Sequence, residues 1–127
     1  MISTTDILRP GLTAGELTTL PLPSKRHAES RIARTDDLGF RNLMTSGSAN
    51  TFTIPSDAQL RATGQVAYPL GAAYLITQYG AGQVTIAGGS GVTLRSESSM
   101  VNISAQYLSV IAHNIGPDEW LLEGKLA

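Results

Sequence analysis

Apolar and polar residues alternate in short runs over most of the chain from residue 40 onward, with small or turn-forming residues between the runs. In residues 50–54 the alternation has period two, so we expect Phe52 and Ile54 to face a core. Strands are further predicted by β-branched and aromatic residues in the runs 40–44, 73–79, 83–87, 92–94, 100–103, 107–113 and 119–124. Seven or eight short strands predict an all-β fold, either a compact antiparallel β-sandwich or a jelly-roll-like barrel.

Two glycine-rich segments, residues 80–82 and 88–91, separate the central runs. Glycine supplies the positive φ angles that tight turns require, so we expect these segments to fold residues 73–94 back as three consecutive strands. Residues 58–68 have a weaker pattern, which predicts a short helical turn followed by a loop. Trp120 is the only tryptophan, and we expect its ring to fill the base of the core; an exposed sugar-stacking ring is the alternative.

The first 34 residues differ from the remainder. Pro10, Pro21 and Pro23 exclude a long helix or a central strand, yet leucine and isoleucine are more frequent than in a typical disordered tail. We therefore predict an extended N-terminal arm over residues 1–34 and a β domain over residues 35–127, with an unstructured terminus as the alternative. Residues 30–33 fit either a helical turn or a first strand.

Charge is sparse and unevenly distributed. The 127 residues have a net charge of -1, and 15% are charged, against a typical value of about 25%. Five of the nine basic residues lie between residues 24 and 41, whereas residues 44–127 carry eight charged residues in all. So few charges favour an oligomer that hides part of the surface. Neither nucleic acid nor membrane is an expected partner, and the absence of cysteine excludes disulfides.

No pattern typical of catalysis is found. His27 and His113 lie far apart without carboxylates at ligand spacing, and the two acidic pairs, Asp36-Asp37 and Asp118-Glu119, fit turns. The glycine-rich segment 88–91 is followed by neither a lysine nor a helix, so it is no phosphate loop. We expect no enzymatic activity, no metal and no cofactor.

Five segments taken together resemble a β module of tailed-bacteriophage virion proteins: residues 48–55, 68–71, 78–86, 91–94 and 118–124. Asp37-Leu38-Gly39 matches the Asp-x-Gly turn that precedes the first clear strand of that module. The family's phenylalanine-proline-x-glycine step appears here as Tyr68-Pro69-Leu70-Gly71. The resemblance covers residues 35–127 and implies a virion structural protein, often oligomeric, without enzymatic activity.

A short arm joined to such a module suits a capsid decoration, or cement, protein on the outer surface of the virion. The expected partners are the major capsid protein and further copies of the chain, with a trimer preferred to a dimer. A tail-fibre or receptor-binding tip that recognises host-surface glycans is the alternative. The predicted capsid-binding residues of the arm are Ile7, Leu8, Leu12, Leu17, Leu20, Leu22, Lys25, Arg26, Arg31 and Arg34. The predicted oligomer interface comprises Tyr74, Ile76, Gln78 and Tyr79.

Overall fold

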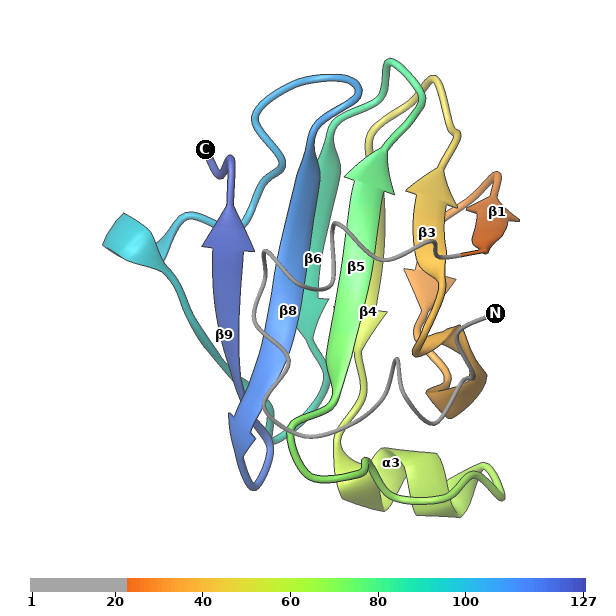
Figure 1. Ribbon diagram of the computed structural model, residues 1–127, viewed down its shortest axis with the longest axis vertical. Coiled ribbons are helices and arrows are strands. Elements are labelled where there is room, and N and C mark those ends of the chain that lie inside the picture. The colour runs from red at the N-terminus through yellow and green to blue at the C-terminus, as the bar shows by residue number, and fades with distance from the viewer. Residues whose placement is uncertain (1–22) are drawn as a thin grey trace.

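The computed structural model describes residues 23–127, which form nine strands, one α-helix and two 3-10 helices (Figure 1). The strands are β1 (Ser24–His27), β2 (Arg31–Ile32), β3 (Arg41–Met44), β4 (Asn50–Ile54), β5 (Ala73–Gln78), β6 (Val84–Gly88), β7 (Thr93–Arg95), β8 (Ser109–Gly116) and β9 (Glu119–Gly124). The helices are η1 (Thr35–Asp37), α3 (Asp57–Ala62) and η2 (Glu97–Ser99). The all-β class expected from the sequence is therefore confirmed.

The strands form two sheets, and the chain crosses between them after every strand as far as β7. A six-stranded sheet has the order β1-β3-β5-β8-β9-β7, and a three-stranded sheet has the order β2-β4-β6. Within each sheet the strands β1, β3, β5 and β2, β4, β6 run parallel to their neighbours. The chain thus winds as a coil of three two-strand units, visible as a front and a back layer in Figure 1.

Between named strands, antiparallel pairing occurs in the C-terminal hairpin and in its contact with β5, and two isolated antiparallel bridges, Thr85 with Asn102 and Ile103 with Leu126, add to it. Strand β8 is antiparallel to β5 and β9 is antiparallel to β8, whereas β7 pairs with β9 in parallel. The expectation of a purely antiparallel domain is therefore wrong. The two glycine-rich segments also do not form hairpins, because each one carries the chain from one sheet to the other.

At one end of the coil the connections between strands stack on one another. This close stacking explains why residues 80 and 82 are glycine. The amide of Gly82 donates to the carbonyl of Ser46 at 3.0 Å, and the amide of Thr45 donates to the carbonyl of His27 at 3.0 Å. A Cβ atom on Gly80 or Gly82 would collide with backbone carbonyls of the corner formed by residues 45–48. Glycine is required here for close approach of backbones rather than for a hairpin turn.

Side chains from both sheets share one core. Phe52 and Ile54 are fully buried, as the alternating pattern of β4 predicts. Tyr74 stacks on Trp120 with ring centroids 5.4 Å apart, and Phe52 meets Tyr74 edge-to-face at 5.5 Å. Trp120 has no exposed surface. The prediction that it fills the core is confirmed, and the sugar-stacking alternative for this ring is excluded.

The single α-helix of the described residues begins where the sequence allows it to be capped. Ser56 Oγ accepts from the amide of Gln59 at 3.1 Å, and Gln59 Oε1 accepts from the amide of Ser56 at 2.9 Å. This reciprocal capping box satisfies two amides that a helix start would otherwise leave unpaired. The short helix expected near residue 58 is confirmed.

The predicted division at residue 34 is wrong, because the folded body begins before it. Strands β1 and β2 pair with β3 and β4, so residues 24–32 belong to the two sheets. Of the two structures considered for residues 30–33, the strand is the one observed. The predicted arm residues Ile7, Leu8, Leu12, Leu17, Leu20 and Leu22 lie outside the described residues. Residues 100–103, expected as a strand, form only isolated bridges, at Asn102 and Ile103.

Candidate interaction surfaces

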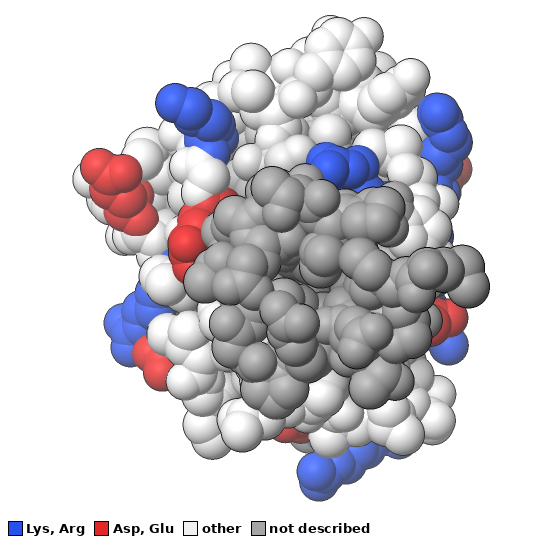
Figure 2. Space-filling model, in the orientation of Figure 1, with Lys and Arg blue, Asp and Glu red and all other residues white. Residues whose placement is uncertain are grey.

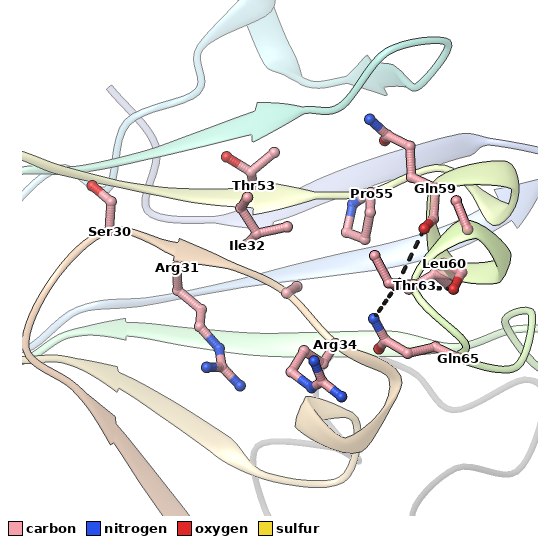
Figure 3. A pocket seen from close by; sticks show the side chains of 12 residues that line it. Ser30, Arg31, Ile32, Arg34, Thr53, Pro55, Gln59, Leu60, Thr63 and Gln65 are labelled. Atoms are coloured by element: carbon pink, nitrogen blue, oxygen red, sulfur yellow. Dashed lines mark hydrogen bonds between the residues drawn. The ribbon is translucent and has the colours of Figure 1, made fainter.

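A groove of about 700 Å³ lies between strand β2 and helix α3 (Figure 3). Its apolar lining includes Ile32, Pro55 and Leu60, and polar side chains from Arg34 and Gln65 flank it. Ile32 is 70% exposed, which is unusual for a large β-branched residue in a strand. An apolar groove of this size with a few polar groups at its rim is typical of a binding site.

The groove lies beside a sheet edge. Among the described strands, β2 pairs with β4 alone, so its other side is an edge. The amide of Ala33 donates to the carbonyl of Thr53 at 2.8 Å and continues this pairing by one residue. The opposite edge of the same sheet is closed, because the amide of Ile103 donates to the carbonyl of Val84 at 2.9 Å. Among the described residues, an extended segment of a partner could therefore add to this three-stranded sheet beside β2 but not beside β6.

Hydrogen bonds hold the polar wall of the groove in place. Gln65 Oε1 accepts from the amide of Thr35 at 2.9 Å, and Gln65 Nε2 donates to Thr63 Oγ1 at 2.8 Å. The Thr63 hydroxyl in turn donates to the carbonyl of Leu60 at 2.9 Å, so the wall is tied to helix α3 (Figure 3). A wall fixed in this way loses little freedom when a ligand binds.

The side chain of Asp37 holds the N-terminal strands together, and two of its partners, Arg31 and Arg34, line the groove. Its fully buried carboxylate accepts from Lys25 Nζ at 2.9 Å, from Arg31 Nε at 3.0 Å and Nη2 at 2.9 Å, and from the amide of Arg34 at 3.0 Å. Burial raises the pKa of the Asp37 carboxyl, but the hydrogen bonds from Arg31, Lys25 and Arg34 outweigh burial and hold that pKa below its ordinary value. The cluster therefore ties β1, β2 and η1 together through one ionised group.

The four basic residues assigned to the arm thus have structural partners in the body. Lys25 and Arg31 bind Asp37, and Arg26 lies over the ring of Tyr79 at 4.9 Å. Arg34 is half exposed and lies 3.5 Å from Asp36. They do not form an extended basic strip, so their assignment to a capsid-binding arm is corrected. The sequence analysis assigned these charges to a capsid partner and missed the buried carboxylate of Asp37, which binds Lys25 and Arg31.

The predicted oligomer interface is also corrected. Tyr74 and Ile76 are fully buried in the core, and Gln78 is 4% exposed. The Tyr74 hydroxyl donates to the carbonyl of Arg34 at 3.1 Å, and Gln78 Oε1 accepts from the amide of Val84 at 3.2 Å. These three side chains are therefore occupied inside one chain. Of the four predicted residues, only Tyr79 lies at the surface.

Tyr79 forms a second exposed feature together with Tyr107, which the sequence did not reveal. The two rings meet edge-to-face with centroids 5.8 Å apart, and Tyr107 is 67% exposed. Gln106 Nε2 donates to the carbonyl of Tyr79 at 3.1 Å. Tyr107 has a φ angle of 68°, a region that non-glycine residues seldom adopt. The strand predicted over residues 107–113 included Tyr107, whereas β8 begins at Ser109, so the ring lies just before the strand.

The acidic pair Asp118-Glu119 supports the turn expected of it and also makes polar contacts that the sequence did not indicate. Asp118 Oδ1 accepts from the amide of Asp57 at 2.9 Å, and Glu119 Oε2 accepts from Arg95 Nε at 2.9 Å. Burial raises the pKa of both Tyr68 and Tyr74, whose hydroxyls bond to each other at 3.1 Å. In residues 23–127 no three histidine, aspartate or glutamate side chains gather as metal ligands do. These polar groups support the fold, and the groove and the tyrosine pair are the surfaces suited to binding.

Within the described part of the chain, no helix has the length and apolar character needed to cross a bilayer. Comparisons of the chain with protein-family models, with curated proteins and with solved structures found no match.

Proposed function

We propose that this protein is a capsid decoration protein of a tailed bacteriophage, which binds the outer surface of the shell and stabilises contacts between capsomers. The proposal is carried by the resemblance of residues 35–127 to virion modules of these phages. It is supported by the composition of residues 1–22, which include seven leucine and isoleucine residues. The groove beside β2 adds a place where the body itself can bind the shell. In this proposal the two sheets act as a rigid β-sandwich of mixed strand direction.

The groove suits an extended apolar segment of the major capsid protein. Such a segment can pair with the backbone edge of β2 and place an apolar side chain against Ile32 and Leu60. Complete burial of the Ile32 side chain contributes roughly 1.5–3 kcal/mol before ordering costs. Many weak contacts on one shell, linked through an oligomer, add up by avidity. We expect a trimer in preference to a dimer, with light scattering as the measurement.

The test is a decoration assay with expanded shells that lack the protein. The variant Ile32→Asp should reduce occupancy of the shells at least about tenfold, since it introduces a charge into an apolar contact worth more than about 1.4 kcal/mol. The matched control is Ile115→Asp, which alters another exposed isoleucine (48%) in the hairpin strand β8. Equal decoration by both variants would exclude the groove as the attachment site. A protein present in only a few copies per virion would exclude the decoration role itself.

A tail-fibre or receptor-binding tip is the second candidate, and the exposed pair Tyr79 and Tyr107 favours it. A tyrosine ring presents an apolar face together with a polar hydroxyl, which suits contact with a saccharide. The corner at residues 46–48 contributes serines, and Arg26 lies over one face of Tyr79, so Tyr107 is the ring with the greater exposure. This candidate predicts that the isolated protein binds glycans on an array and that Tyr107→Ala removes the binding. An array without hits would leave the decoration role as the better proposal.

A further inference from the structure

One side of the groove between β2 and α3 is a continuous stretch of backbone. Residues 30–34 all line it, and they include both residues of β2. A compact ligand would contact only part of such a side, whereas an extended segment can follow its whole length. The edge therefore favours a peptide in strand conformation over a small molecule.

The hydrogen bonds of β2 show which backbone groups are open to that peptide. The amide of Ala33 donates to the carbonyl of Thr53 at 2.8 Å, so the backbone groups of Ala33 face β4. Those of the preceding residue, Ile32, point the other way, because neighbouring residues of a strand alternate in direction. The amide of Arg34, which also points away from β4, donates to Asp37 Oδ2 at 3.0 Å. Within the described part of the chain, Ile32 is therefore the residue of this stretch that offers both a donor and an acceptor.

Ile32 and Arg34 present their side chains on the same face of this edge. Arg34 has extended backbone angles, φ -120° and ψ 159°, so the alternation of β2 continues through it. Ala33 between them is 1% exposed, whereas Ile32 is 70% exposed and the Arg34 side chain is 50% exposed. Figure 3 shows both side chains beside the groove. Because opposite side chains of paired strands contact one another, an added strand places one residue against Ile32 and another, two positions along, against Arg34.

The charge of the lining selects the residue opposite Arg34. Among the described residues that line the groove, Arg31 and Arg34 are cationic and none is acidic. Arg31 is bound to the buried carboxylate of Asp37, so Arg34 is the cation that a ligand can reach. The carboxylate of Asp36 lies 3.5 Å from Arg34 Nε but is 67% exposed, and such exposed pairs are weak. An acidic side chain of a partner can therefore compete for the guanidinium.

A groove with cations and no acid is distinctive in a chain with few charges. Residues 44–127 carry eight charged residues, and in Figure 2 the charged side chains of the described residues are scattered over the visible face rather than gathered in one patch. A glutamate or aspartate opposite Arg34 gains charge-assisted hydrogen bonds, which a planar guanidinium can make to both carboxylate oxygens. Pairing of two β2 edges from two copies would instead bring Arg31 and Arg34 of both copies together. The charges thus favour an acidic partner segment over a second copy of the chain.

Given the proposed role of the groove in attachment, on which this assignment rests, we propose that the groove binds an extended segment of a protein partner in which an acidic and an apolar residue are two positions apart. The backbone of the segment pairs with Ile32. Its apolar side chain packs against Ile32 and Leu60, and its carboxylate binds Arg34. The residue between the two lies on the opposite face of the added strand.

Synthetic peptides test the spacing and the charge without capsids. The test peptides carry glutamate and leucine two positions apart, in either order, within a short run of serine and threonine. The control peptides have lysine in place of glutamate, or have glutamate and leucine three positions apart. Amide signals of Ile32 and Leu60 in the isotope-enriched full chain report binding up to millimolar peptide.

One of the two test peptides should bind at least about threefold more tightly than every control peptide, and this preference should decrease at high salt. The order that binds gives the direction of the added strand. Equal binding of all the peptides, or binding of none, overturns the proposal.

Variants of the protein test the contact with the carboxylate. Arg34→Gln should remove the preference for glutamate over lysine, and Arg34→Glu should reverse it. The matched control is Arg61→Gln in α3, which changes the net charge as Arg34→Gln does but lies outside the groove lining, and it should keep the preference. A preference that survives Arg34→Glu would overturn the assignment.

Methylation of the peptide backbone tests the strand pairing. A methyl group on the leucine nitrogen and one on the nitrogen that follows it should have opposite effects, since neighbouring amides of a strand point to opposite sides. Equal effects would contradict pairing with Ile32. Shells decorated normally by a protein that does not distinguish the peptides would refute only this recognition, whereas selective peptide binding by a protein that does not decorate shells would refute only the decoration role.

Discussion

The buried carboxylate of Asp37 offers a quantitative test of how the N-terminal strands are held. The variant Asp37→Asn keeps the shape of the side chain but places an amide NH₂ among donors from Lys25, Arg31 and the Arg34 backbone. Breaking a buried ion pair costs about 3–5 kcal/mol. Here Lys25 and Arg31 remain 28% and 30% exposed, so water can solvate part of the freed charge. We therefore expect a loss of about 2–4 kcal/mol, or about 7–14 °C in Tm for a chain of this length.

The pH dependence of this difference identifies its cause. The pKa of Asp37 is lowered in the folded state, so its contribution to stability is fully present above the pKa of the unfolded chain, near 4. The contribution is lost as the pH falls through the lower folded-state pKa. Thermal unfolding followed by circular dichroism should thus show a large difference between Asp37→Asn and wild type at pH 7 that shrinks at about pH 3 and below. A difference that is the same at both pH values would refute the ionic explanation.

The control for this experiment is the neighbouring acid. Asp36 is 67% exposed, and its nearest cation atoms, in Arg34 and Lys25, lie at 3.5 and 3.6 Å. Exposed pairs of this kind contribute about 0–1 kcal/mol, so Asp36→Asn should change the Tm little at any pH. If Asp36→Asn destabilised the protein as much as Asp37→Asn, the distinction between the buried and the exposed carboxylate would be wrong.

Three further predictions concern the body. Gly82→Ala should destabilise the protein by about 1–3 kcal/mol in urea titration because its Cβ meets a stacked carbonyl, whereas Gly47→Ala, with open space around it, should be within about 0.5 kcal/mol of wild type. Ser56→Ala removes the cap of α3 and should cost about 1 kcal/mol by the same measurement; an unchanged midpoint would show that the capping box is dispensable. Trp120 is fully buried, so acrylamide should quench its fluorescence weakly in the native protein and strongly in urea; strong native quenching would contradict the core position.

Positions of strands could be predicted from the sequence far better than their partners. The alternation in residues 50–54 depends only on which side of a strand meets a core, and this strand and the one predicted over residues 119–124 both occur as expected. Pairing depends on the path that the chain takes after each strand. A glycine-rich segment such as residues 80–82 is compatible with a hairpin turn and also with a crossing between two sheets, so the sequence does not distinguish them. The decisive contact, between Gly82 and Ser46, is 36 positions away in the sequence and leaves no local signal.

The errors in the candidate site have a common physical origin. Tyr74 and Gln78 were expected at an oligomer interface, but partners inside the same chain satisfy their polar atoms. Lys25 and Arg31 appeared as exposed charges because the buried partner, Asp37, was assigned to a turn. In each case the sequence shows a polar group but not the partner that satisfies it, and that partner decides whether the group is buried.

The coil topology explains why the two proposed surfaces are separate and can be tested separately. A coil of stacked strand pairs has two ends, and each end needs a cover. At the C-terminal end, residues 101–103 pair with β6 and β9 pairs with β7, so strands close it. At the N-terminal end, β1 and β2 are short and carry the basic side chains of Lys25, Arg26 and Arg31. Short, charged edge strands disfavour nonspecific pairing with strands of other chains.

The groove and the tyrosine pair should therefore respond to different variants. The groove opens beside β2, whereas Tyr79 follows β5 and Tyr107 precedes β8. The variant Ile32→Asp should reduce decoration of shells without altering binding of glycans. The variant Tyr107→Ala should reduce any binding of glycans without altering decoration. If the two variants gave the same pair of effects, one surface would have to serve both roles, and the division of the molecule into two separate binding surfaces would fail.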